Sequence, residues 1–294
     1  MKKFSNKIKA NYKQIKVKNP GMIVWLFLPV LIFYLITHYI FGKPRNLVLG
    51  MSTEQQPQVS SQESGQNLLQ KFESFKWNGK GAVSLVFTGA FKNQYDYGYA
   101  DISARGLSAS VAVPVNSVGL PGTMSWLNIH LLQFKGWEII SLSRDQICDK
   151  EKLKDKNILA SEIEDSKNDL TKLGFIVNLY LPPCGIVTTN ILNRVESYYK
   201  GLMRFGIKSN DIFSINPYSL TIRQVNNTVK FENVKFWIDS ARINHSWLIL
   251  SFPNIGDSVD PNNVSYDLLD KTLNEISKSD LQVAVPGEIL KYGR

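Results

Sequence analysis

The stretch Ala82–Val115, AVSLVFTGAFKNQYDYGYADISARGLSASVAVPV, holds two short apolar runs on either side of a longer mixed segment. Val83–Phe87 and Ser108–Val115 are rich in the β-branched and aromatic residues that favour strands. Gln94–Arg105, between them, has the length and pattern of a helix. Two strands joined through a helix form a parallel βαβ unit, so this stretch predicts an α/β fold.

The same alternation continues to the carboxyl end of the chain. Further strands are expected at the apolar runs Trp137–Leu142, Phe175–Leu181, Ile212–Ile215, Trp247–Phe252 and Leu281–Val285. Helices are expected at Ser125–Lys135, Ser161–Leu173, Thr189–Tyr199, Val234–Ile243 and Ser265–Lys278. The second of these helices begins with the S-x-x-E pattern of a capping box. Residues 76–294 therefore predict one domain, a parallel α/β sheet or barrel with its functional residues at the carboxyl ends of the strands.

An uncharged stretch precedes this region. Residues 21–41, GMIVWLFLPVLIFYLITHYIF, are long enough to cross a hydrocarbon core of about 30 Å as one transmembrane helix. Residues 1–20 carry seven lysines, so the positive-inside rule places this basic tail in the cytoplasm and the bulk of the chain outside. A cleaved signal peptide is the alternative, but the run exceeds the roughly 7–15 apolar residues of that element. Residues 42–75 are rich in Gln and Ser and predict a flexible stalk.

The positive charge of the chain belongs to its amino-terminal part. The formal charge is +9, from 34 basic and 25 acidic residues. Residues 1–45 hold nine of the basic residues and no acidic one, which leaves 25 of each sign in residues 46–294. Binding to nucleic acid needs a local basic excess, which residues 46–294 lack, so we expect no nucleic-acid partner. The expected partner of residues 21–41 is the membrane.

Several motifs in residues 80–290 resemble those of the polysaccharide deacetylase family, the NodB homology domain, in order and spacing. Ala82–Val115 is similar to its opening strand, F-D-D-G motif, helix and second strand. Further similarities lie at Gly122–Trp126 (G-x-M-T-W), Gly136–Ile139 (G-H-E-I), Ser161–Leu173 (E-I-x-x-S-K), Leu181–Gly185 (P-P-x-G), Ile238–Asp239 and Trp247–Leu250. The resemblance implies a distorted TIM-like (β/α) barrel. It also implies a divalent metal such as zinc, held by an aspartate and two histidines, with a second aspartate as base and a late histidine as acid.

The positions that the resemblance assigns to this chemistry are altered. Thr88 and Gly89 stand where the two aspartates are expected, and Leu142 and Gln146 stand where the two ligand histidines are expected. Pro253 stands at the position of the late histidine. The three histidines of the chain, His38, His130 and His245, lie elsewhere. Arg144 would place a positive charge near the metal position, which disfavours a cation. We therefore expect a divergent, catalytically degenerate member of this family without a metal.

Weaker candidates remain near the strand ends. Arg144 and Asp145 could pair across the vacated site and bind a sugar hydroxyl, although a structural ion pair or a solvated loop is the simpler interpretation. Asp239 could serve as a lone base, but we expect it on the solvent side of a helix. Trp126 and Trp247 could stack on sugar rings if they line a groove, whereas aromatic residues beside strands are core residues by default.

The chain has two cysteines, Cys148 and Cys184. One disulfide bond is possible in an oxidising compartment, but we expect two free, buried thiols. Cys184 follows a strand end and would be a possible nucleophile, although no histidine is placed to lower its pKa.

Two functions stay open. The first is a non-catalytic module, anchored in the membrane and exposed outside the cytoplasm, that binds cell-envelope polysaccharide or an envelope protein. The second is an active carbohydrate deacetylase that removes N- or O-acetyl groups through a rearranged site, with Asp145, Asp239 or Cys184 as its reactive residue. The loss of every metal and acid–base position favours the first, because a fold does not by itself imply a function.

Overall fold

The computed structural model describes residues 78–257 and 260–292. The expected basic tail (1–20), transmembrane helix (21–41) and stalk (42–75) lie outside these residues. Across the two described ranges, every helix is too short or too polar to cross a membrane.

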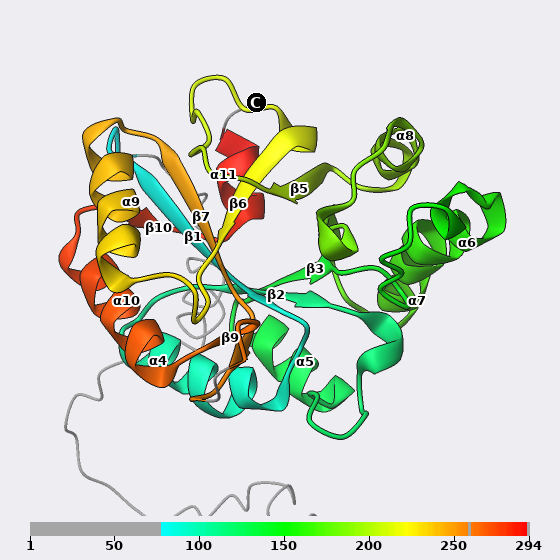
Figure 1. Ribbon diagram of the computed structural model, residues 1–294, viewed down its shortest axis with the longest axis horizontal. Coiled ribbons are helices and arrows are strands. Elements are labelled where there is room, and N and C mark those ends of the chain that lie inside the picture. The colour runs from blue at the N-terminus through cyan, green and yellow to red at the C-terminus, as the bar shows by residue number, and fades with distance from the viewer. Residues whose placement is uncertain (1–77, 258–259, 293–294) are drawn as a thin grey trace, which may run out of the picture. The chain divides into compact units, whose positions relative to one another are not determined.

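Seven parallel strands form a closed barrel (Figure 1). They are neighbours in chain order: β1 (Ala82–Thr88), β2 (Ser110–Val113), β3 (Glu138–Ser141), β4 (Val177–Tyr180), β5 (Gly201–Phe205), β6 (Leu220–Gln224) and β7 (Trp247–Phe252). The barrel closes where β1 pairs with β7, from Ala82 opposite Trp247 to Phe87 opposite Phe252. β10 (Gln282–Val283) pairs with the beginning of β1. The expected α/β barrel is confirmed.

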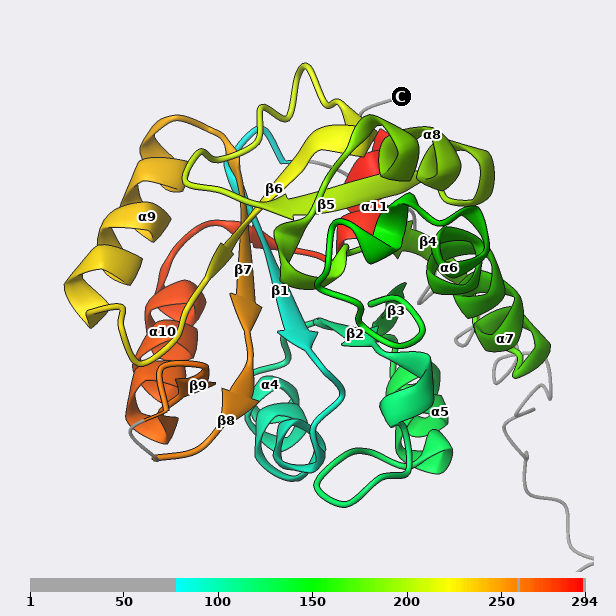
Figure 2. The same cartoon turned by 45° about the vertical axis from the view of Figure 1, so that its right-hand side comes forward.

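Helices surround the strands (Figure 1). In chain order they are η1 (Gln94–Gly98), α4 (Tyr99–Ala104), α5 (Trp126–Phe134), α6 (Lys156–Ala160), η4 (Ser161–Asp165), α7 (Ser166–Lys172), α8 (Thr189–Tyr198), α9 (Phe231–Ile243) and α10 (Tyr266–Lys278). Short 3-10 turns stand at η2 (Val115–Ser117), η3 (Lys152–Lys154), η5 (Pro183–Gly185) and η6 (Pro217–Ser219). β8 (Asn254–Ile255) and β9 (Asn263–Val264) form a separate small sheet. Figure 2 shows β1 and β7 side by side with α9 and α10 outside them.

Strand residues alternate between the interior of the barrel and the helix layer. Val83, Leu85 and Phe87 of β1 belong to the larger apolar cluster, which includes the inner faces of the helices. Ala82 and Val86 of the same strand belong to a second cluster inside the barrel. Both faces of β1 are therefore buried, as its nearly continuous apolar sequence indicates.

The amino end of the barrel, where the strands begin, is closed by α11 (Pro286–Tyr292). Ile289 and Leu290 of this helix are buried in the interior cluster together with Trp247. The Glu138 Oε2 atom, at the beginning of β3, accepts a hydrogen bond of 2.8 Å from the Gly287 backbone N–H. Burial raises the pKa of Glu138 to about 7.

Two local predictions were wrong. Ile212–Ile215 is not a strand but part of the connection between β5 and β6. Asn210 directs this connection, because its backbone pairs with Trp247 and its side chain binds Thr221 N–H at 2.7 Å and Thr221 C=O at 2.9 Å. Ile212 is thereby placed in the barrel interior.

The expected capping box at Ser161 is also absent. The helical segment begins earlier, at Lys156, where the Asp155 carboxylate accepts hydrogen bonds from the Asn157 and Ile158 backbone N–H groups. Ser161 lies inside the segment, at the start of the π-helical turn η4. The helix therefore starts at a different N-cap residue, Asp155, six residues before Ser161.

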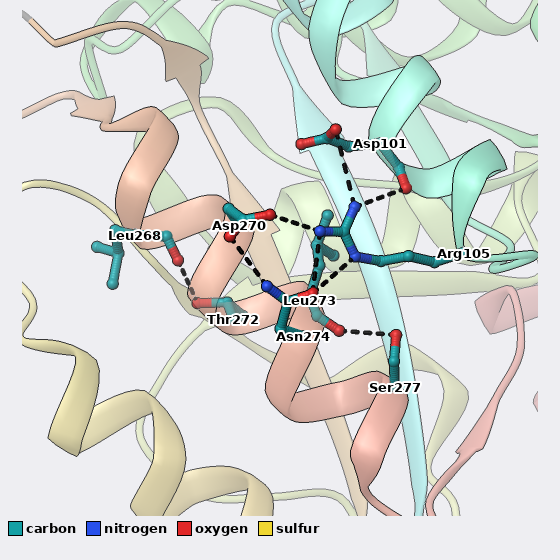
Figure 3. A network of polar contacts seen from close by, with 8 residues as sticks. All are labelled: Asp101, Arg105, Leu268, Asp270, Thr272, Leu273, Asn274 and Ser277. Carbon is teal, nitrogen blue, oxygen red and sulfur yellow. Dashed lines mark hydrogen bonds and ion pairs between the residues drawn. The ribbon is translucent and has the colours of Figure 1, made fainter.

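Polar contacts join α4 to α10 on the outside of the β1–β7 closure (Figure 3). The Arg105 guanidinium donates to the Asp101 carbonyl at 3.0 Å, to Asn274 Oδ1 at 3.0 Å through Nη2, and to Asp270 Oδ1. One arginine thus links the first helix after β1 to the helix after β7, across the seam where the barrel closes.

Candidate functional site

The positions of interest lie at the carboxyl ends of five strands. We call these segments the rim: residues 88–94, 114–117, 142–148, 181–185 and 253–255. In a parallel α/β barrel this end carries the functional residues, because the loops that leave the strands meet there.

The Gln94 side chain joins the ends of β1 and β7. It is fully buried, and its Nε2 atom donates to the Thr88 carbonyl and the Pro253 carbonyl, each at 2.9 Å. Its Oε1 atom accepts from the Phe91 N–H at 3.0 Å. Thr88 and Pro253 replace an expected aspartate and the late histidine, so a neutral amide connects two positions expected to hold acid–base groups.

The Phe91 ring covers the second aspartate position. Gly89 has a φ of 102°, and a Cβ atom built on it would collide with the Phe91 ring. Ala90 follows with a φ of 50°, in the left-handed region that glycine prefers and where the F-D-D-G motif has its glycine. The space for an aspartate side chain at position 89 is therefore occupied by the Phe91 ring.

The Glu162 carboxylate organises the loop after β3. Glu162 is 1% exposed; its Oε1 atom accepts from the Asp145 N–H at 3.0 Å and its Oε2 atom from the Ile147 N–H at 3.2 Å. The Ser143 hydroxyl also donates to Oε2. One buried carboxylate therefore satisfies three donors of a loop that the resemblance expects to carry two metal ligands.

The two histidine positions in this loop hold an aliphatic side chain and an amide, and neither offers an imidazole nitrogen. Leu142 is buried in the barrel interior and has no ligating atom. The Gln146 amide donates to the Ser117 hydroxyl at 3.4 Å. Gln146 has a φ of 57° and Ser143 a φ of 70°, so the loop turns sharply at both residues.

Arg144 and Asp145 do not pair with each other, contrary to the first interpretation weighed above. Arg144 turns to the η4–α7 segment, where it lies 3.4 Å from the Asp165 carboxylate and 3.3 Å from the Asp169 carboxylate. Asp145 accepts a hydrogen bond of 2.6 Å from the Asn116 side-chain amide. Asp165 and Asp169 are four residues apart in one helical segment, so both carboxylates can approach the same guanidinium group.

Cys148 and Cys184 form a disulfide bond, with Cα atoms 5.6 Å apart. The expectation of two free, buried thiols is therefore wrong, and both residues are exposed. The bond joins the loop after β3 to the turn after β4, which the distance of 36 residues in sequence does not reveal. A disulfide sulfur has no thiol proton to lose, so Cys184 is not a nucleophile in this state.

The remaining candidates do not belong to the rim segments defined above. Trp247 is fully buried and its Nε1–H donates to the Ser84 hydroxyl at 3.0 Å inside the barrel. Trp126 packs on Phe175, with ring centroids 5.9 Å apart. Trp247 is therefore a core residue, whereas Trp126 is half-buried and has one ring face or edge against Phe175. Asp239 lies on α9, as expected, with its carboxylate 3.6 Å from Lys235 and 3.7 Å from Arg242.

Buried hydroxyl groups support the loop after β3 from behind. The Ser166 hydroxyl is 3.0 Å from both the Ser141 hydroxyl and the Tyr199 hydroxyl. Burial raises the pKa of Tyr199 to about 12 and raises that of Tyr180 well above its ordinary value. Both phenols are therefore neutral at physiological pH and act as fixed hydrogen-bonding groups.

These residues do not fit a divalent metal. Position 89 has no side chain, position 142 is aliphatic, and the Gln146 amide is bound to Ser117. In residues 78–257 and 260–292 no group of three or more His, Cys, Asp or Glu side chains is placed to hold a metal ion. The single carboxylate at the centre of the loop, Glu162, is already bound by three donors.

Comparison with known proteins gives the fold a name. No family model and no curated protein matches the chain. A deacetylase with substrate superposes with a TM-score of 0.51 and 12% identity, over 73% of this chain and 93% of that chain. A CE4 family pseudoenzyme from Bacillus anthracis superposes with a TM-score of 0.50 and 10% identity, over 72% of this chain and 66% of that chain. The fold is that of the polysaccharide deacetylases.

A polysaccharide deacetylase from Bacillus cereus is also similar, with a TM-score of 0.40 and 16% identity over 48% of this chain. The chain covers 46% of the length of that protein. At such identities the likeness concerns the deacetylase fold alone.

Three residues that organise the rim were not predicted as such from sequence. Gln94 follows the turn after β1, and its amide gave no reason to expect a contact with Pro253, which is 159 residues away. Glu162 stands at a variable position of the expected S-x-x-E capping box and begins the E-I-x-x-S-K similarity, and neither pattern indicated its part in the loop after β3. Phe91 was the one of the three that the sequence could have indicated. It follows Ala90, the glycine position of the F-D-D-G motif, and a large side chain there must cover the adjacent backbone.

Proposed function

We propose that this chain is a divergent member of the polysaccharide deacetylase family with a degenerate catalytic centre, and that it acts by binding. In this proposal it needs no metal. It is anchored in the membrane by residues 21–41, with residues 1–20 in the cytoplasm and the barrel outside. Its partner is a cell-envelope polysaccharide or an envelope protein.

The observation that carries the proposal is that the buried polar side chains at the rim form hydrogen bonds with backbone groups of the rim loops. Gln94 binds the Thr88 and Pro253 carbonyls, and Glu162 binds the loop that contains Leu142 and Gln146. The positions at which the resemblance expects metal ligands and acid–base groups are thus held by a neutral amide and an already bound carboxylate. General acid–base catalysis needs a group that can exchange a proton with the substrate, and metal catalysis needs free ligands.

The disulfide bond supports the extracytoplasmic placement. Cys148 and Cys184 are both exposed, and an exposed pair of this kind persists in oxidising compartments but is rare in the cytoplasm. The charge distribution around residues 21–41 predicts the same orientation.

The decisive test measures acetate release by the full-length protein in detergent. Substrates are acetylated chitin oligomers and acetylated cell-envelope polysaccharide, each with and without added zinc. We expect no release above that of heat-denatured protein, together with sedimentation of the native protein with insoluble envelope polysaccharide or with an envelope protein. Metal-dependent release would overturn the proposal in favour of an active deacetylase with a rearranged site.

Matched variants identify the group responsible if release occurs. Asp145→Asn tests the exposed rim carboxylate, and Asp239→Asn tests a carboxylate on α9 that is bound by two cations. Loss of release in the first variant alone would assign the rearranged site to the rim. Equal release in both variants would place it elsewhere.

A further inference from the structure

Large apolar side chains project at the amino end of the barrel, opposite the rim. Phe134, the last residue of α5, is 82% exposed, and Ile176, in the connection from α7 to β4, is 72% exposed. Ile243, the last residue of α9, is 66% exposed. Each residue ends or follows a helix that leads back to the start of a strand, so all three lie at the same end of the barrel.

Two of these residues, Phe134 and Ile176, lie on segments that hydrogen bonds join. The Gln133 amide of α5 donates to the Gly174 carbonyl at 3.4 Å, and its Oε1 atom accepts from the Ile176 N–H at 3.0 Å. These bonds hold the end of α5 against the connection from α7 to β4. We call Phe134, Leu173 and Ile176 the apolar tip; all three are exposed.

The connections around the apolar tip are basic. Six connections lead from helices back to strands: residues 105–109, 135–137, 173–176, 199–200, 244–246 and 279–281. They contain three basic residues, Arg105, Lys135 and Lys200, and one acidic residue, Asp280. Asp280 pairs with Lys80, and Arg105 pairs with Asp270. Lys172 stands directly before the third connection. The connections at the carboxyl ends of the strands are balanced, with seven basic residues (Lys92, Arg144, Lys150, Lys152, Lys154, Lys208, Lys230) and seven acidic ones (Asp145, Asp149, Glu151, Asp155, Asp211, Asp257, Asp260).

The chain also enters the barrel at this end. The Asn78 N–H donates to the Gln282 side chain at 3.1 Å, and β1 begins at Ala82. Residues 42–75 connect this point to the expected membrane span. In the proposed arrangement, the expected flexible stalk of this length has a root-mean-square extension of about 30 Å, so the barrel can reach the bilayer that holds the anchor. Tethering of this kind makes even a weak surface contact effective.

We propose that the amino end of the barrel docks on a bilayer surface that carries anionic lipids. The apolar tip enters the interface between head groups and acyl chains, and Lys135, Lys172 and Lys200 lie among the anionic head groups. This inference rests on the proposed membrane anchoring. It directs the rim away from the bilayer, toward the envelope, where a polysaccharide or a partner protein would meet it.

The test uses the full-length protein in vesicles of phosphatidylcholine with and without phosphatidylglycerol. A polarity-sensitive fluorophore is attached to a single added cysteine under non-reducing conditions, so that Cys148 and Cys184 remain bonded. Phe134→Cys places the label in the apolar tip. Tyr97→Cys, on η1 after β1, places it near the rim, and Leu127→Cys places it at the other end of α5; both residues are exposed.

We expect spin-labelled lipid to quench the label at position 134 at least about twofold more than the label at position 97, with a larger difference when phosphatidylglycerol is present. Equal quenching at the two positions, in protein that stays in the vesicles after carbonate washing, overturns the docking and leaves the anchoring intact. Release by carbonate overturns both. A blue shift at positions 127 and 134 that needs no lipid and grows with protein concentration overturns the docking in favour of self-association through α5.

Discussion

At the amino end of the barrel, Ile289 and Leu290 of α11 enter an apolar interior, whereas at the rim Gln94 and Glu162 bind backbone groups of the loops. The amino end is closed by burial of apolar surface, which is non-directional and tolerates exchange of one aliphatic residue for another. The rim is closed by hydrogen bonds that need one particular atom at one place. A single substitution at the rim should therefore change the free energy of unfolding by a large amount even when it removes few atoms.

The largest effect is expected at Glu162. We expect Glu162→Ala to lower the free energy of unfolding by about 3–4 kcal/mol, because it leaves the Asp145 and Ile147 N–H groups and the Ser143 hydroxyl without their acceptor. Denaturant unfolding measures the change. Glu151→Ala is the control, since Glu151 is exposed and, among the residues that the structure describes, forms an ion pair only with the exposed Lys154. This variant should change the value by less than about 1 kcal/mol. Equal effects of the two variants would show that the rim is not held by its buried carboxylate.

The disulfide bond is the covalent part of the rim. Reduction should lower the free energy of unfolding by about 3 kcal/mol, because the bond closes a loop of 36 residues in the unfolded chain. The measurement is denaturant unfolding with and without a reductant. The double variant Cys148→Ser, Cys184→Ser should have the stability of the reduced protein and should not respond to reductant. An unchanged midpoint in the reduced wild-type protein would contradict this expectation.

At the amino end the expected effect depends on pH. The pKa of Glu138 rises from 4.5 to about 7 on folding, so between these values the folded state binds more protons than the unfolded state. The contribution of Glu138 to the free energy of unfolding is therefore fully present below pH 4.5. It falls by about 2–3 kcal/mol as the pH rises from 4.5 past 7.

Glu138→Gln isolates this contribution, because the amide does not titrate and its oxygen can still accept from the Gly287 N–H. The difference in the free energy of unfolding between variant and wild type should shift in favour of the variant as the pH is raised from 4.5 to 8. A difference that is independent of pH would show that Glu138 ionises in the folded protein as it does in the unfolded chain.

The smallest effects concern the turn after β1. Gly89→Ala should lower the free energy of unfolding by about 2 kcal/mol, because Gly89 has a φ of 102° and its new Cβ atom would meet the Phe91 ring. Ala90→Gly should raise it by up to about 1 kcal/mol, because glycine adopts a φ of 50° without steric cost. Thermal unfolding of the two variants checks the opposite signs. A stabilising Gly89→Ala would show that Phe91 does not cover this position.

The barrel itself could be predicted from the alternation of apolar runs and helical stretches. Val83–Phe87 and Trp247–Phe252 are nearly continuous apolar segments, as buried parallel strands require, and both are strands. β5 and β6 were missed because Met203, Arg204 and Phe205 form no long apolar run, while Ile212–Ile215 does and is a connection. A short strand in a closed barrel is held mainly by its neighbours, so its own sequence carries a weak pattern.

The candidate site was predictable in part. The absence of the expected aspartates and histidines at Thr88, Gly89, Leu142 and Gln146 is a property of the sequence. The groups that occupy these places could not be predicted from the sequence. Gln94 and Glu162 act through contacts with atoms that are distant along the chain, and Phe91 acts through its position over Gly89. The pairing of Arg144 with Asp165 and Asp169 also depends on the direction in which the loop leaves β3.

The amino-acid sequence alone determined the α/β class, the order of most elements and the loss of the expected ligand set, because these follow from residue type and from periodicity along the chain. The tertiary structure decided the closure of the barrel, the Cys148–Cys184 bond and the use of Gln94 and Glu162 at the rim. These features join residues 15 or more positions apart, or join backbone groups to one particular side-chain atom. Such bonds form only when the whole chain has brought their partners together, and a local pattern of hydrophobicity does not encode them.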